Sequence, residues 1–136
     1  MNIDEMRGRV ETARVARLAT LGSDGTPHLV AFCFVLAGDV LYSAVDRKKK
    51  RTPRLRRLAN VARDPRVTVL VDHYEEDWTG LWWVSLTGRA RELDPGLEAE
   101  QALRLLSDKY EQYVELPPEG PVMRIEVLRW SGWTAS

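Results

Sequence analysis

The stretch Thr-Pro-His-Leu-Val-Ala-Phe-Cys-Phe-Val-Leu-Ala-Gly-Asp-Val-Leu-Tyr-Ser-Ala-Val, residues 26–45, decides which fold the chain can take. It predicts one long strand, Thr26–Leu36, a turn at Ala37-Gly38-Asp39, and a second strand, Val40–Val45. Both faces of the long strand are apolar, whereas a half-exposed antiparallel sheet has one polar face. We therefore expect this strand to line a barrel interior on one side and to meet a helix or a second subunit on the other.

The same reading extends outward to the rest of the 136 residues. A Gly-Ser-Asp-Gly turn precedes the long strand, and Gly88 is a plausible β-bulge. Helices are expected after Asn2, from Thr52 to Asp64, and from Asp94 to about Tyr113. The six expected strands are Val15–Leu21, Thr26–Leu36, Val40–Val45, Arg66–His73, Trp78–Arg91 and Val122–Trp130. Six antiparallel strands in a single domain of residues 1–136 predict a mainly β, α+β fold closed into a barrel.

Charge is the most uneven feature of the sequence. The net charge is zero, but residues 47–57 hold eight cationic side chains and no acid. Outside this basic segment, twelve bases stand against twenty acids. Cations at that density repel one another, and an anionic ligand would relieve the repulsion.

The basic segment has the setting of a phosphate site. It lies between a predicted strand and a predicted helix N-terminus, whose free N–H groups favour anions. Ser43 and Thr52 add hydroxyl donors. Three charge-assisted bonds of about 1.5–3 kcal/mol each would supply most of the roughly 8 kcal/mol of a micromolar complex. A solvated basic loop is the plain alternative, and nucleic-acid binding is disfavoured because the rest of the surface is acidic.

The other reactive residue types point away from side-chain catalysis. Cys33, in an apolar run, reads as a small buried hydrophobe, and neither His28 nor His73 has a second metal ligand at local spacing. The adjacent Trp82 and Trp83 would face opposite sides of a strand. One of them could lie at a subunit interface or over a planar ligand, and ordinary core and interface packing is the plain alternative. We expect no metal site, and the sequence identifies no catalytic residue. We therefore expect a bound cofactor to carry the chemistry. The charged N-terminus and the absence of a long apolar run predict a cytoplasmic protein that does not enter the membrane.

Several motifs together resemble a known family. They are Ala19-Thr20-Leu21, Asp24-Gly25-Thr26-Pro27-His28, Leu41-Tyr42-Ser43, and the run from Leu58-Ala59-Asn60 to Asp64-Pro65-Arg66-Val67. The chain resembles the pyridoxamine 5′-phosphate oxidase-like split-barrel proteins, among them the flavin/deazaflavin oxidoreductases of actinobacteria. A subgroup of F-420-dependent enzymes is indicated by Asp72-His73-Tyr74 with Asp77-Trp78, Leu81-Trp82-Trp83-Val84, Lys109-Tyr110 and Trp130-Ser131-Gly132-Trp133.

The resemblance implies an FMN-binding-like split barrel that is a homodimer with two cofactor sites at the interface. By position, the implied phosphate ligands are Ser43, Lys48, Lys50, Arg51 and Thr52. The ring would lie near the strand that holds His28 and Val30, with Trp83 or Trp133 supplied by the partner.

The resemblance leaves the cofactor open. F-420 is favoured over FMN because eight cations exceed what one phosphate needs. The implied activity is hydride transfer from reduced deazaflavin to a small conjugated acceptor, such as a quinone, a biliverdin-like pigment or an unsaturated ester. The alternatives are an FMN-dependent oxidase or reductase and a non-enzymatic binder of the cofactor or of a tetrapyrrole.

Overall fold

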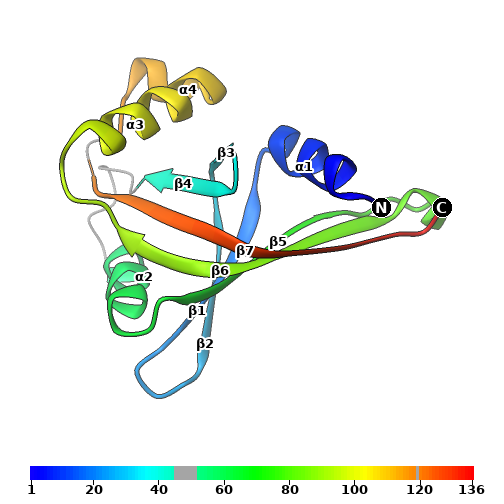
Figure 1. Cartoon of the computed structure of the whole chain (residues 1–136), viewed down its shortest axis with the longest axis horizontal. Helices are drawn as coiled ribbons and strands as arrows, with labels where there is room; N and C mark the ends of the chain where they lie inside the picture. Colours follow the sequence, from blue (N-terminus) through cyan, green and yellow to red (C-terminus); the bar gives the residue numbers. More distant parts are fainter. Residues whose placement is uncertain (45–51, 119) are drawn as a thin grey trace.

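The computed structural model describes residues 1–44, 52–118 and 120–136, and these form one curled antiparallel sheet flanked by helices (Figure 1). The strand order is β2-β1-β5-β6-β7-β4-β3. The strands are β1 (Ala16–Leu21), β2 (Pro27–Phe32), β3 (Val35–Ala37), β4 (Val40–Ala44), β5 (Arg66–His73), β6 (Trp82–Glu92) and β7 (Val122–Thr134). The helices are α1 (Ile3–Thr12), α2 (Thr52–Arg63), α3 (Leu97–Lys109) and α4 (Glu111–Glu115), with a 3₁₀ turn η1 (Trp78–Gly80).

The sheet curls because two strands that follow each other in the chain lie at its opposite edges. Only Cys33 and Phe34 separate β2 from β3, yet β2 begins the strand order and β3 ends it. The expectation of one strand over Thr26–Leu36 was therefore wrong, and seven strands replace the expected six. The mainly β, α+β class is confirmed, in the form of a half-barrel.

The corner between β2 and β3 is held by the end of α3. The N–H of Phe34 donates to the Tyr110 hydroxyl over 3.1 Å, and Lys109 Nζ donates to the Phe34 carbonyl over 2.9 Å. The Lys109 amine also lies 3.9 Å from the centre of the Phe34 ring. These contacts satisfy backbone groups where the chain turns out of the sheet ladder. Burial, followed by the charge of Arg14, lowers the pKa of Lys109 to about 8.

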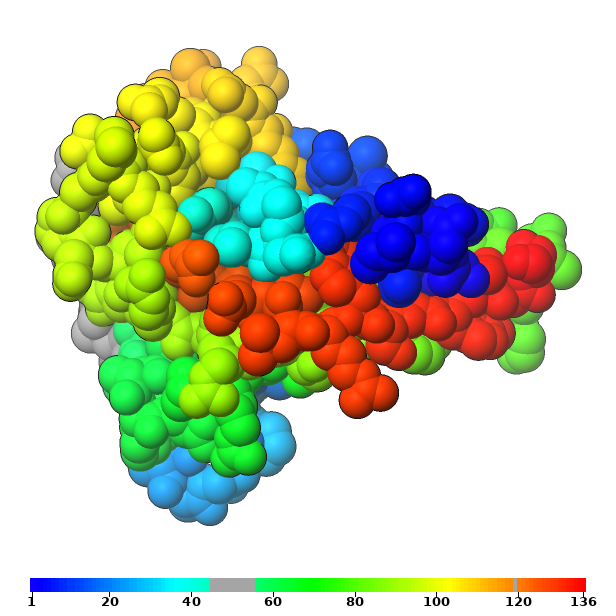
Figure 2. Space-filling view, viewed as in Figure 1, coloured from blue at the N-terminus to red at the C-terminus, as the bar shows by residue number. Residues whose placement is uncertain are grey.

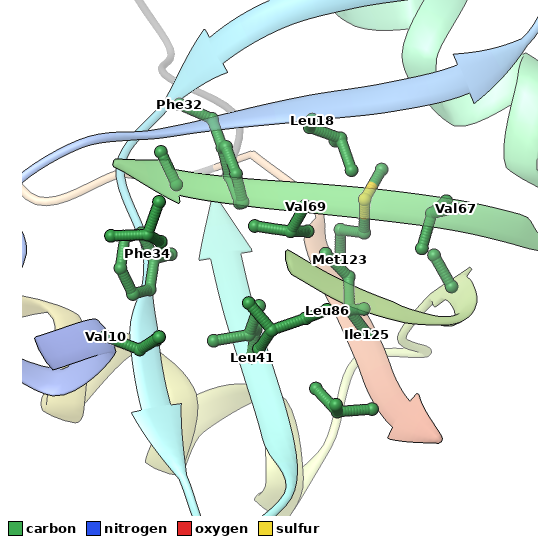
Figure 3. Close-up of a cluster of buried hydrophobic side chains, with 14 of the residues drawn as sticks. Val10, Leu18, Phe32, Phe34, Leu41, Val67, Val69, Leu86, Met123 and Ile125 are labelled. Carbon is green, nitrogen blue, oxygen red and sulfur yellow. The ribbon is translucent and has the colours of Figure 1, made fainter. Parts of the chain in front are cut away.

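The core fills the inside of the curl. Figure 3 shows side chains from opposite parts of the sheet pointing toward one another, with Val10 of α1 closing one side. Inward residues alternate along β5, where Val67, Val69 and Val71 are buried and their neighbours are exposed. This alternation is what a sheet with one buried face produces.

The predicted bulge at Gly88 is confirmed by a register shift between Thr87 and Gly88 in the pairing of β6 with β7. A Cβ atom at this position would lie 2.0 Å from the carbonyl oxygen of Glu126. Only glycine allows this close approach of the two backbones.

The paired ends of β5, β6 and β7 and the turn η1 extend beyond the half-barrel as an arm, residues 72–83 and 133–136 (Figures 1 and 2). β7 continues to Thr134, four residues past the expected end, because it pairs with β6 as far as Trp82. The expected strand start at Trp78 was wrong, since Asp77 caps the short turn η1 there. The third expected helix also breaks, at Tyr110, into α3 and α4.

Within the described residues, no helix is long and apolar enough to cross a membrane.

The bulge gives a stability prediction. Gly88→Ala should lower the free energy of unfolding by about 3 kcal/mol, because the new methyl group overlaps the backbone of β7. Gly8→Ala is the matched control: nothing lies within 4 Å of its Cβ position in α1, so this change should stabilise the protein by about 0.5–1 kcal/mol. Urea unfolding measures both. Equal effects of the two substitutions would contradict the bulge geometry.

Candidate cofactor site

Strand β4 leads the chain to the basic segment. Its Ser43 is buried and pairs with Met123 of β7, which fixes the end of the strand from the side. Lys48, Lys50 and Arg51 lie outside the described residues, as does the side chain of Thr52. The predicted phosphate ligands can therefore be placed only through Ser43 and through the helix that follows.

Helix α2 begins at Thr52, as the Thr-Pro pair predicted, and carries the last cations of the basic segment. Arg56 is exposed and Arg57 is half-buried. Both lie close enough to His28 of β2 to affect its ring: burial first, and then the charges of Arg56 and Arg57, lower the pKa of His28. The structure thus brings together His28 and the described end of the basic segment, which are separated by about thirty residues in the sequence.

His28 has the features of a residue that faces a ligand. Its Nδ1 atom is buried and has no hydrogen-bond partner among the described residues. A buried polar atom without a partner costs free energy, and a ligand group would supply the partner. An anion bound at this place would also offset the two guanidinium charges.

A polar contact that sequence analysis did not assign fixes α2 against the sheet. Asn60 and Thr20 are both buried, and Asn60 Nδ2 donates to Thr20 Oγ1 over 3.0 Å. Arg63 donates to the Leu21 carbonyl over 2.7 Å and to Asn60 Oδ1 over 3.0 Å. Sequence periodicity does not reveal this contact, because Asn60 and Thr20 belong to different elements and are forty residues apart. This network sets where Arg56 and Arg57 lie.

Val30 follows His28 on the same face of β2. It is partly buried and packs against the main core. Leu29 and Ala31 point the other way and are exposed. Strand β2 therefore has one face toward the core and α2, and one apolar face that no part of the described chain covers.

The two tryptophans expected near the ring lie elsewhere in the same chain. Trp83 and Trp133 are direct cross-strand partners on the arm, and their side chains are 37% and 45% exposed. Figure 1 shows the arm and α2 at opposite ends of the molecule. One chain by itself therefore does not bring these tryptophans to His28.

A shallow groove of about 460 Å³ crosses the outer face of the sheet. Its floor is small or apolar, and Arg66 and Arg89 lie beside it. Arg66 is held by Asp64 through contacts of 3.0 and 2.7 Å, and these bonds lower the pKa of Asp64 to about 2. The lining comprises Ala19, Thr20, Leu21, Pro27, Arg66, Val67, Thr68, Thr87, Gly88, Arg89 and Leu128.

Sequence and fold comparisons define the class of this protein. The family model described as pyridoxamine 5′-phosphate oxidase matches residues 3–134. The chain therefore belongs to the pyridoxamine 5′-phosphate oxidase family. No curated protein matches it in sequence.

Solved structures share the fold. A conserved hypothetical protein from Mycobacterium tuberculosis has a TM-score of 0.81 and 24% identity, over 99% of this chain and 86% of the other. A FAD-binding protein from Mesorhizobium loti has a TM-score of 0.72 and 24% identity, over 97% and 92%. The heme storage protein HutZ from Vibrio cholerae has a TM-score of 0.70 and 14% identity, over 97% and 91%. One fold thus serves proteins with different ligands.

The position of His28 gives a prediction for NMR. Phosphate that binds near Arg56 and Arg57 should raise the pKa of His28, because the added negative charge offsets the two cations. The ring resonances of His28 are followed through a pH titration with and without phosphate. At constant pH, the ring resonances of His73, on the arm, should not respond to phosphate. If phosphate leaves the pKa of His28 unchanged, no anion binds near this ring.

Proposed function

We propose that this protein binds F-420 at the site formed by His28, α2 and the basic segment, and that it is an F-420-dependent reductase. The observation that carries the proposal is the buried Nδ1 atom of His28, which has no hydrogen-bond partner among the described residues, on a ring whose pKa is lowered by burial and by the charges of Arg56 and Arg57. When bound, the deazaflavin would supply hydride transfer to a small conjugated organic acceptor.

The chain's own residues supply the binding. Ser43, Lys48, Lys50, Arg51 and Thr52 are proposed to hold the anionic part of the cofactor. F-420 carries a phosphodiester and an oligoglutamate tail, so its negative charge is spread along its length. Eight cations over eleven residues suit such a ligand better than they suit the single phosphate of FMN.

A flavin is the second candidate. The similar protein from Mesorhizobium loti is described as FAD-binding, and FAD carries a pyrophosphate that also suits a dense group of cations. In that case the protein would be a flavin-dependent oxidase or reductase. A carrier of heme or another tetrapyrrole is the third, since HutZ shares the fold.

Titration of the purified protein with F-420, FMN and FAD distinguishes these functions. Five tryptophans make binding visible as fluorescence quenching. We expect F-420 to bind with micromolar affinity, and Lys48→Ala/Lys50→Ala to weaken it at least about tenfold by removing charge-assisted bonds. Arg104→Ala, which removes an exposed charge from α3, should leave the affinity unchanged. Preferential FMN or FAD binding would replace the F-420 function, and binding of heme alone would favour a carrier.

The apolar outer face favours a homodimer. Leu29 and Leu70 are 67% and 38% exposed, and both belong to the outward rows of the sheet. Charge is also divided along this face. Asp72, Glu75, Glu76 and Asp77 lie at the arm, whereas α2, which carries the last cations of the basic segment, lies at the other end.

We propose that two copies pack by these outer faces, related by a two-fold axis. Such an isologous contact places the acidic arm of one copy toward the basic end of the other. It would bring Trp83 and Trp133 of the partner toward the site that one chain leaves without them. Aligned packing of two sheets also covers both apolar faces.

Analytical ultracentrifugation, which gives the mass of the protein in solution, tests the proposed dimer. The wild type should sediment at twice 15.5 kDa, and Leu70→Arg should shift it to the monomer because a charge replaces the apolar contact. Val114→Arg makes the same change at another exposed position, on α4, and should leave the dimer intact. A monomeric wild type, or loss of the dimer with Val114→Arg, contradicts this interface.

A further inference from the structure

A hydrogen-bonded group of three residues joins α3 to the strand that leads to the basic segment. The hydroxyl of Tyr42 in β4 donates to Glu98 Oε2 over 2.6 Å. Arg124 Nε in β7 donates to the same oxygen over 2.9 Å. Tyr42 of β4 and Arg124 of β7 are direct cross-strand partners. The Glu98 carboxylate therefore binds β4 and β7 at the same register position.

This contact lies next to the candidate site. Tyr42 precedes Ser43, and β4 ends one residue later, at Ala44. Strand β4 lies between β7 and β3 in the sheet. Strand β3 has only three residues, and these pair with Val40, Leu41 and Tyr42 of β4. Within the described residues, Ser43 and Ala44 therefore pair only with β7. In this part of the chain, the Tyr42 hydroxyl makes the last side-chain hydrogen bond that joins β4 to an element outside the sheet.

The carboxylate is well suited to hold this strand. Glu98 lies in the first turn of α3, where a negative charge is favoured by the helix dipole. The bond from Tyr42, more than the pairing with Arg124, lowers the pKa of Glu98, so the group is ionised at neutral pH. The other end of α3 is held at Phe34 by Lys109. Helix α3 is therefore joined to the half-barrel by hydrogen bonds near both of its ends.

We infer that Glu98 is a positioning residue for the cofactor site, acting through the Tyr42 hydroxyl on the end of β4 that carries Ser43. This role rests on the proposed function, because it concerns the affinity of that site. Glu98 and Tyr42 do not belong to the proposed ligand set. Their effect on binding is exerted through the position of the strand.

Tyr42→Phe tests the role with little change of shape. It removes the bond to Glu98 while Arg124 still pairs with the carboxylate. We expect the Kd for F-420, or for FMN if that is the cofactor bound, to rise about fivefold, the effect of losing one hydrogen bond. Hydrogen exchange of the peptide 40–44 should become faster. Glu98→Gln keeps an oxygen acceptor and should give a smaller rise in Kd.

Val10→Ala is the control for general loss of stability. Val10 is fully buried in α1, which does not belong to the β4–α3 contact. This variant should melt at a lower temperature than the wild type but keep its Kd and the exchange rate of residues 40–44. Faster exchange in Tyr42→Phe with an unchanged Kd would show a purely structural bond and overturn the inference. Unchanged exchange would overturn it as well.

Failure of the proposed function is visible separately. If the wild type binds none of F-420, FMN and FAD, the cofactor site itself is refuted and the positioning role is refuted with it. If the wild type binds and only Tyr42→Phe is indistinguishable from it, the proposed function stands and the role of Glu98 is refuted.

Discussion

The fold depends on how the chain turns at Cys33-Phe34. Because β2 and β3 lie at opposite edges of one sheet, two residues must bridge the edges, and the sheet has to curl. The turn takes Phe34 out of the ladder while its side chain stays in the core. Lys109 and Tyr110 satisfy its backbone groups, which ties α3 to the same corner. The half-barrel, the place of α3 and the alignment of β4 all follow from this one turn.

Separation of charge is the second organising feature. Helix α2, which carries the last cations of the basic segment, lies at one end of the molecule and the acidic arm at the other (Figure 1). Eight cations within eleven residues repel one another, and this repulsion favours a partner of opposite charge. Two kinds of partner relieve it, an anionic ligand and the acidic arm of a second copy. The proposed function includes both the anionic ligand and the acidic arm of a second copy. The two do not compete, because the ligand neutralises the site and the arm covers it.

The proposed site would bind a cofactor without an obvious catalytic side chain among the described residues. The described residues around His28 supply charge, a buried polar edge and a fixed helix, which are the means to bind and orient a ligand. Asn60 and Glu98 are not among the proposed ligands, yet each fixes an element that carries one or more of them. These residues position the elements that carry the proposed ligands. Such positioning matters most when the bound molecule supplies the chemistry.

The sequence by itself determined the class of the fold, most of the element boundaries and the cationic character of the site. Strand alternation, the Asn2 and Thr52-Pro53 helix starts and the Gly88 bulge are local effects of backbone preference and side-chain period, so residues a few positions apart reveal them. Only the tertiary structure decided the break at Cys33-Phe34, the break of the third helix at Tyr110 and the length of β7. Each of these is set by a partner distant in the sequence: α3 for the corner, Phe34 and Arg14 for Tyr110, and β6 for β7. For the same reason, the approach of Arg56 and Arg57 to His28 and the distance of Trp83 from that site became visible only once the sheet had curled.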